Sequence, residues 1–306
     1  MNDDHDLLTP RMAGVLERIA RAARPPFHSM TPVQARKFYQ LGAEILDLPR
    51  APLAHVEDLE LARRPARRYA SSADADQPTL LYFHGGGFTI GSLETHDSLC
   101  RQLALRGRCT VIALDYRLAP EHPFPAAVDD CWAALQALKA QGVKRLAVGG
   151  DSAGGTLAAV CALQARDADL DLDLALQLLI TPGTIAHADS ESHRRFANGY
   201  LLDAESIRWF FNHYIPEGQR EDWRFAPLLA DDHAGLAPAL VLLAEADPLV
   251  DEGIDYADRL RAAGTAVDLE LFRGVTHDFI KMGRVIPEAQ QALDVCGVAL
   301  QKAFER

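Results

Sequence analysis

The stretch VGGDSAGGT, Val148 to Thr156, surrounds a single serine with four glycines. Glycine costs roughly 0.5 to 1 kcal/mol relative to alanine inside a regular element, so such a cluster marks a sharp bend or a close backbone approach. The run RLAVG before it is typical of a strand, and AGGTLAAVCALQA after it is typical of a helix. Gly150 to Gly154 therefore fits the G-x-S-x-G pattern of a strand–turn–helix elbow that lifts a serine hydroxyl above a sheet.

A phosphate-binding turn is the alternative for a glycine-rich link between strand and helix. GGDSAGG lacks both the lysine of a P-loop and the spacing of a G-x-G-x-x-G dinucleotide site. The pattern favours the elbow.

Downstream of Pro78, short apolar runs alternate with helical patterns, which indicates a parallel sheet buried on both faces. Two short alternating runs, 56–61 and 66–70, are typical of an antiparallel edge pair. Two helical patterns lie at the N-terminal end, before the first expected strand. Nearly sixty residues separate Ile180, at the end of one expected strand, from Ala239, at the start of the next. We expect residues of about 1–48 and about 186–226 to form a helical cap over the strand ends of a single domain, 1–306. The apolar runs that we expect to form the strands of the parallel sheet are 79–83, 110–114, 145–150, 176–180, 239–245 and 267–272.

Composition argues for a small-molecule partner. The chain has 306 residues and a formal charge of −12, with no basic run longer than a pair, which argues against nucleic-acid binding. It has no secretory signal pattern and no apolar window of roughly 18 to 20 residues, so we expect a cytoplasmic protein without a stable membrane anchor. Five widely spaced cysteines predict buried thiols rather than disulfides or a metal site.

A serine hydroxyl is a poor nucleophile until a neighbouring base accepts its proton. His277 follows the last apolar strand, at the sheet edge where Ser152 is expected. Asp247 ends the preceding strand and is the favoured acid; Asp251 and Glu252 are the alternatives, in the first turn of the next helix. Along the chain, Ser152 comes first, Asp247 second and His277 third, and this is the order of serine, acid and histidine in one known class of catalytic triads.

The run HGGGF, 84–88, follows another strand and is a candidate oxyanion hole. We expect Gly85, Gly86 and Gly87 to form this loop, with the amide of Ala153 as a further donor. His84 and His96 are expected to brace structure. Seven other histidines are expected to be solvated: His5, His28, His55, His187, His193, His213 and His233.

Five motifs in order resemble the bacterial hormone-sensitive-lipase-like family of α/β-hydrolase esterases (family IV). They are HGGGF, DYRLAPEHPFPAAVDD (115–130), GDSAGG, DPLVDEG (247–253) and HDF (277–279). The resemblance implies an α/β-hydrolase fold with an eight-stranded, mostly parallel sheet, flanked by helices and topped by a cap. It also implies hydrolysis of short- to medium-chain carboxylic esters, small-molecule substrates, no metal and no organic cofactor.

Carried over to this chain, the resemblance makes Ser152 the nucleophile, His277 the base and Asp247 its partner. It implies Gly86, Gly87 and Ala153 as oxyanion donors, with Gly85 shaping the turn. Phe88, Trp209, Phe210 and Tyr214 become candidates for substrate binding, although the last three are equally well explained as the core of the cap. We expect a monomer or homodimer.

One departure from the family pattern is Asp278, which stands where many relatives have glycine. Its carboxylate would raise the pKa of the neighbouring imidazole if it pointed inward, but we expect it to point to solvent. An amidase or lactonase would use the same triad, because pocket shape chooses the leaving group. A non-catalytic receptor on the same fold is the alternative of another class, disfavoured because all three triad positions are filled.

Overall fold

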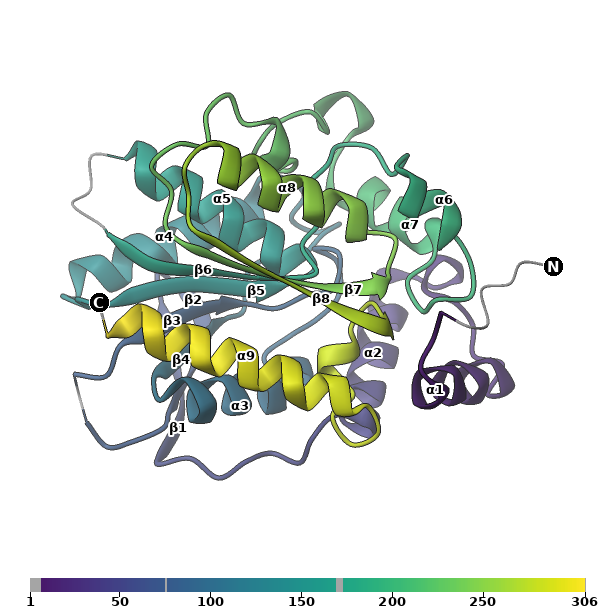
Figure 1. The fold of residues 1–306 in the computed structure, drawn as a ribbon, viewed down its shortest axis with the longest axis horizontal. Helices are drawn as coiled ribbons and strands as arrows, with labels where there is room; N and C mark the ends of the chain where they lie inside the picture. Colours follow the sequence, from purple (N-terminus) through teal and green to yellow (C-terminus); the bar gives the residue numbers. More distant parts are fainter. Residues whose placement is uncertain (1–6, 75, 169–172, 306) are drawn as a thin grey trace.

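The structure, a computed structural model, describes residues 7–74, 76–168 and 173–305. Its centre is an eight-stranded sheet in the order β1-β2-β4-β3-β5-β6-β7-β8 (Figure 1). The pairs β1–β2 and β2–β4 are antiparallel and all other pairs are parallel, which confirms the expected edge pair and the mostly parallel sheet. The strands are β1 His55–Leu61, β2 Arg64–Ala70, β3 Thr79–Phe83, β4 Thr110–Leu114, β5 Leu146–Asp151, β6 Leu174–Ile180, β7 Ala239–Ala246 and β8 Val267–Thr276.

Helices cover both faces of the sheet (Figure 1). Two large clusters of buried apolar residues form the core of the protein. The first core includes residues of α4 Ala126–Ala140, α5 Ala153–Asp167 and α8 Val250–Ala262. The second core includes residues of α3 Asp97–Gly107 and α9 Pro287–Phe304. Strands β3, β4 and β5 are buried throughout, as expected for runs without polar alternation. Because these three strands are parallel, their carboxyl ends lie at one edge of the sheet, where loops can converge.

Segments from both ends of the expected cap lie beyond this edge (Figure 1). The N-terminal segment contains α1 Pro10–Arg21, η2 Phe27–Ser29 and α2 Pro32–Leu46; residues 1–6 lie outside the described residues. Thr31 and Gln34 form a capping box at the start of α2, which explains why this helix begins at Pro32. The insertion after β6 contains α6 Glu191–Arg195, α7 Ala204–Tyr214, η4 Glu217–Gln219 and η5 Pro227–Leu229.

The cap segments are attached to the sheet body by specific contacts. Arg36 of α2 forms a two-pronged ion pair with Glu121 and donates to the carbonyl of Thr89 at 2.8 Å. Met12 and Val15 of α1 are buried in the second core. Two short turns complete the fold, η3 Glu94–His96 and η6 Phe279–Lys281, and the second follows β8 directly.

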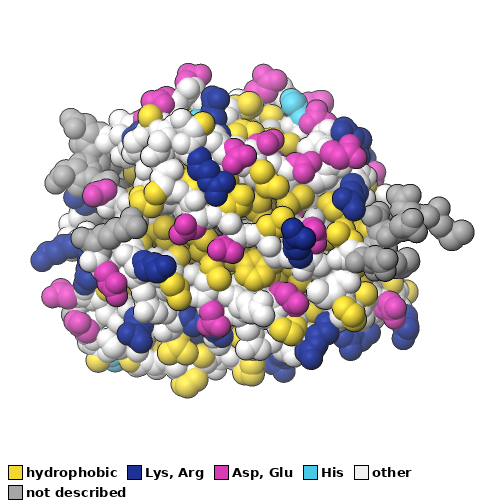
Figure 2. Space-filling model, viewed as in Figure 1, with side chains coloured by type: hydrophobic (Ala, Val, Ile, Leu, Met, Phe, Trp, Pro, Cys, Tyr) yellow, Lys and Arg dark blue, Asp and Glu magenta, His cyan; other side chains and the backbone are white. Residues whose placement is uncertain are grey.

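All five cysteines are buried and free, as predicted. Burial raises the pKa of each thiol. Within the described ranges, no helix combines the length and the apolar character that crossing a bilayer requires. Figure 2 shows acidic and basic side chains interspersed over the face viewed there, without a large field of one sign.

Candidate active site

Ser152 lies in a strained turn between β5 and α5. Its φ of 53° places a residue other than glycine in a left-handed region, and its amide donates to the carbonyl of Ile180 at 2.8 Å. A Cβ on Gly154 would lie 1.9 Å from the carbonyl oxygen of Phe83, and one on Gly150 would lie 2.3 Å from the backbone of Gly154. The glycines around the serine are therefore required by backbone crowding, as the sequence predicted.

The three predicted triad side chains lie together in a hydrogen-bonded line. His277 Nε2 is 3.0 Å from Ser152 Oγ, and His277 Nδ1 is 2.7 Å from Asp247 Oδ2. The other Asp247 oxygen, Oδ1, accepts from the amide of Leu249 at 2.9 Å, which fixes the direction of the carboxylate. The three residues follow β5, β7 and β8, so the sheet edge assembles them from distant parts of the sequence.

The electrostatics suit a proton acceptor at His277. Burial alone would lower the pKa of His277, but the carboxylate of Asp247, with smaller contributions from Asp278 and Asp151, outweighs this penalty and the net pKa is raised. The imidazolium that forms on accepting a proton is thereby stabilised, while the ring stays within reach of the serine hydroxyl.

The two alternative acids have other partners. Asp251 accepts from the amide of Ser192 at 2.7 Å, and Glu252 accepts from the amide of Thr184 at 2.6 Å. The Glu252 side chain turns inward and is 2% exposed, so it does not act simply as a solvated charge at a helix start. Both carboxylates instead hold the insertion after β6 against α8.

The glycine-rich loop after β3 is held from beneath by Asp151. The amide of Gly85 donates to Asp151 Oδ1 at 3.1 Å, whereas Gly86, Gly87 and Ala153 line the cavity beside Ser152. Gly85 is therefore a brace of the loop and not a free oxyanion donor, which corrects its inclusion in the expected hole.

No sequence motif assigned a role to the side chain of Asp151. Asp151 is 2% exposed and accepts from Tyr82 Oη at 2.6 Å, and its Oδ2 lies 3.1 Å from His96 Nε2. Burial would raise the pKa of Asp151, but His96, Lys281 and Tyr82 together lower it. An aspartate at the end of a fully buried strand was the available signal, since a buried charge needs partners.

His84 and His96 brace this loop, as expected. His84 Nδ1 is 2.8 Å from the carbonyl of Gly85, and its ring stacks on Tyr116 with centroids 4.3 Å apart. Burial, with a smaller contribution from His96, lowers the pKa of His84 to about 3, so this ring is neutral at neutral pH.

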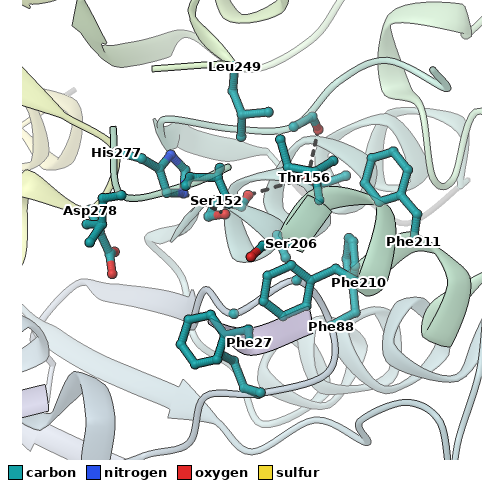
Figure 3. A pocket seen from close by; sticks show the side chains of 18 of the residues that line it. Phe27, Phe88, Ser152, Thr156, Ser206, Phe210, Phe211, Leu249, His277 and Asp278 are labelled. Atoms are coloured by element: carbon teal, nitrogen blue, oxygen red, sulfur yellow. Dashed lines mark hydrogen bonds between the residues drawn. The ribbon is translucent and has the colours of Figure 1, made fainter. Parts of the chain in front are cut away.

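A cavity opens above Ser152 and His277 (Figure 3). It includes about 910 Å³ of empty space, part of which is open to solvent at its mouth. Its wall is mostly apolar and comes from both segments of the expected cap as well as from the sheet body. The labelled apolar side chains are Phe27, Phe88, Phe210, Phe211 and Leu249.

The predicted substrate-binding residues divide into two pairs. Phe88 and Phe210 line the cavity. Tyr214 does not: it is 1% exposed and stacks on the far side of Phe88, with centroids 4.0 Å apart. Trp209 also lies off the wall and packs on Phe210 and His213. Tyr214 and Trp209 therefore belong to the core of the cap. Phe27 and Phe211 were missed because no motif marks them, and Leu249 was missed because the DPLVDEG motif that contains it pointed to its acidic residues instead.

Three sequence expectations about charged groups are wrong. Asp278 was expected to point to solvent, but its side chain lines the cavity wall and pairs with Lys281 at 3.1 Å. His193 and His233 were expected to be solvated, but they are 4% and 2% exposed. His193 contacts the buried Glu252, and His233 Nε2 lies 2.9 Å from the carbonyl of Pro227. His5 lies outside the described residues.

Comparisons with known proteins agree with this geometry. The family model described as the alpha/beta hydrolase fold matches residues 80–281. An ethyl acetate hydrolase from Pseudomonas putida is 40% identical over 316 residues, covering 96% of this chain and 99% of that protein.

Solved structures give the same result. An ester hydrolase from the metagenome of Lake Arreo, solved with a derivative of bipyridine phosphonate, superposes with a TM-score of 0.92 at 39% identity, covering 98% of this chain and 100% of its own. A hyperthermophilic esterase from the archaeon Pyrobaculum calidifontis gives a TM-score of 0.90 at 33% identity, covering 96% of this chain and 98% of its own. The chain therefore belongs to the α/β-hydrolase family, in its hormone-sensitive-lipase-like branch.

Proposed function

We propose that this chain is a carboxylic ester hydrolase in which Ser152 is the nucleophile, His277 the general base and then acid, and Asp247 its orienting partner. The observation that carries the proposal is the continuous line from Ser152 Oγ through the imidazole to Asp247, with distances of 3.0 and 2.7 Å. Relatives named as ester hydrolases support it.

The reaction proceeds in two halves. Ser152 Oγ attacks the ester carbonyl while His277 Nε2 accepts its proton, and the tetrahedral intermediate expels the alcohol, which takes that proton from His277. Water then attacks the acyl-enzyme, again losing a proton to His277, and the acid is released as Ser152 recovers its hydrogen. Asp247 keeps Nδ1 protonated and stabilises the imidazolium in both halves.

The negative oxygen of each tetrahedral intermediate needs donors beside the serine. We assign this task to the backbone amides of Gly86, Gly87 and Ala153, which belong to residues that line the cavity next to Ser152. Removing one such donor costs roughly 3 to 4 kcal/mol of transition-state stabilisation in comparable enzymes.

The cap, residues of about 1–48 and about 186–226, supplies much of the substrate pocket in this proposal. Phe27 comes from its first segment and Phe210 from its second, and both line the cavity. Their apolar side chains suit short- to medium-chain acyl esters. The cytoplasmic location and the monomeric or homodimeric state expected from the sequence remain predictions.

The test is hydrolysis of p-nitrophenyl butyrate by purified wild-type protein and the S152A variant. We expect S152A to lose activity by a factor of about a thousand or more. The matched control is S206A, because Ser206 lines the same cavity without belonging to the triad. Near-wild-type activity in S152A, or an equal loss in S206A, would contradict the assignment.

Two further measurements separate the alternatives. A fluorophosphonate probe should label wild-type protein and not S152A, whereas a receptor without an activated serine would not react. A panel of matched esters, amides and lactones measures the leaving-group preference, and kcat/KM values higher for amides or lactones than for esters would replace the esterase assignment.

A further inference from the structure

The residue after the proposed base is held in an unusual position. Asp278 has a φ of 66°, a left-handed conformation that is uncommon for residues other than glycine. Its side chain lines the cavity beside His277 (Figure 3) and is 22% exposed. A carboxylate kept at a strained backbone position on a mostly apolar wall calls for an explanation.

Two side chains hold this carboxylate. Tyr39 of α2 donates from Oη to Asp278 Oδ2 at 3.2 Å, and Lys281 Nζ lies 3.1 Å from the same oxygen. Lys281 also donates to Tyr39 Oη, and its ammonium lies 4.6 Å from the centre of the Tyr39 ring. Asp278, Tyr39 and Lys281 thus form a closed set of contacts, named here the latch, between the cap and the loop that carries His277.

The lysine of the latch is almost fully buried. The Lys281 side chain is 7% exposed, and burial would lower the pKa of its ammonium. Asp278, Tyr39 and Asp151 outweigh that penalty and raise the pKa, so Lys281 stays charged through the neutral range. A buried ammonium of this kind depends on its carboxylate partner.

We propose that Asp278 is a positioning residue for ester hydrolysis: Tyr39 and Lys281 fix its carboxylate beside His277, and through it helix α2 of the cap is coupled to the general base. The inference rests on the proposed function, because it concerns the residue assigned there as the base. It gives the first cap segment a part in catalysis in addition to its place in the pocket wall.

The charge of the latch acts on His277 with two opposite signs. Asp278 favours the imidazolium, whereas Lys281, which is paired with Asp278, offsets the charge of that carboxylate. D278N and K281M leave the other titratable groups around the latch and His277 unchanged. Asp247 after β7 pairs with His277, and Asp151 at the end of β5 also raises the pKa of His277. His96 in η3 lies 3.5 Å from Lys281, and Tyr39 in α2 contacts Asp278.

The central experiment measures the pH profile of kcat/KM for a neutral ester. The acidic limb of this profile reports protonation of the free enzyme's base. In D278N the limb should move to lower pH by about half a unit, because a negative charge beside the imidazolium is lost. In K281M it should move to higher pH, because Asp278 is left without its counter-charge. In the double variant D278N/K281M it should return toward the wild-type position.

The matched control is D258N. Asp258 and Arg261 form an ion pair with the same i,i+3 spacing at 3.2 Å, but on an exposed part of α8. D258N makes the same change in net charge and should leave the profile unchanged. Where K281M does not fold, the D278N shift and the double variant decide. Shifts of equal sign in D278N and K281M, or no shift in folded D278N, would overturn the proposal.

Coupling to the cap is tested with Y39F, which keeps the ring on the cavity wall and removes the hydroxyl. We expect kcat to fall about threefold with KM nearly unchanged, and the same change to have no further effect in a D278N background. Independent, additive effects would refute the coupling. S152A distinguishes the two levels: activity retained in S152A defeats the proposed function, whereas an inactive S152A beside an unshifted D278N defeats only the latch.

Discussion

The elbow around Ser152 and helix α2 of the cap both contain glycine, but for different reasons. At Gly154 an added Cβ would lie 1.9 Å from the carbonyl oxygen of Phe83, whereas an added Cβ at Gly42 in α2 would meet no atom within 4 Å apart from its chain neighbours and the backbone of its own helix. At the elbow, two stretches of backbone are in direct contact and leave no room for a side chain. The cap is held by contacts between side chains, so we expect substitutions there to change stability or activity by smaller amounts.

Aromatic packing illustrates this second kind of order. Phe27 lies 6.1 Å from Phe38 and from Tyr39, and 6.0 Å from Phe210 of α7, measured between ring centroids. These contacts join the two cap segments above the cavity. Rigid backbone geometry therefore positions Ser152, whereas the wall of the cavity depends on side-chain packing that tolerates change.

The largest effect is expected for G154A. The nearest obstacle is backbone of β3, which cannot move away cheaply, so we expect either failure to fold or loss of esterase activity by a factor of about a thousand or more. Thermal unfolding monitored by circular dichroism and p-nitrophenyl butyrate hydrolysis measure the two results. A stable, fully active G154A would show that the elbow is less crowded than its geometry indicates.

An intermediate effect is expected for F210A in the cap. Phe210 is 7% exposed, lines the cavity and lies against Gly87, where a Cβ would be 2.3 Å from its ring. Its loss should widen the pocket, raise KM for short acyl esters about tenfold and favour longer chains, with stability lowered by about 3 kcal/mol.

The matched control for this variant is W209A, which removes the neighbouring aromatic side chain that lies off the cavity wall. Its acyl-chain profile, measured on p-nitrophenyl esters of increasing length, should resemble that of the wild type. Equal changes of profile in both variants would mean that Phe210 acts through general cap stability and not through pocket shape.

The smallest effect is expected for G42A. The residue lies inside α2 with open space around it, so alanine should raise the free energy of unfolding by about 0.5 to 1 kcal/mol through helix propensity. Urea denaturation measures the change, and kcat/KM should stay at the wild-type value. A loss of stability would indicate that α2 needs flexibility at this position.

The sequence predicted the elbow and the sheet well because local rules govern both. Glycine spacing, apolar runs and strand-end positions are set by backbone sterics and burial, and they located Ser152, Asp247 and His277 together at one edge. The antiparallel edge pair was predicted for the same reason.

The cavity wall and the charged network were predicted less well. Trp209 and Phe210 are adjacent in one helix, and only their rotation toward the cavity separates a wall residue from a core residue. Asp278 was misassigned although Lys281 lies only three positions away, because the contact that ties Asp278 to the cap comes from Tyr39, 239 positions away, and such a partner leaves no local pattern. Gly85 lies in the expected loop, but the direction of its amide depends on Asp151 of another strand.

Because all five natural cysteines are buried, a cysteine introduced at the surface could be labelled selectively. Thiol reagents attack the thiolate, and each natural thiol is both shielded and hard to ionise. A single Arg208→Cys substitution on α7, where the arginine side chain is 61% exposed, would therefore create the one fast-reacting position in the native fold. A fluorophore or spin label attached there could follow cap motion during turnover in a protein that keeps all of its natural cysteines.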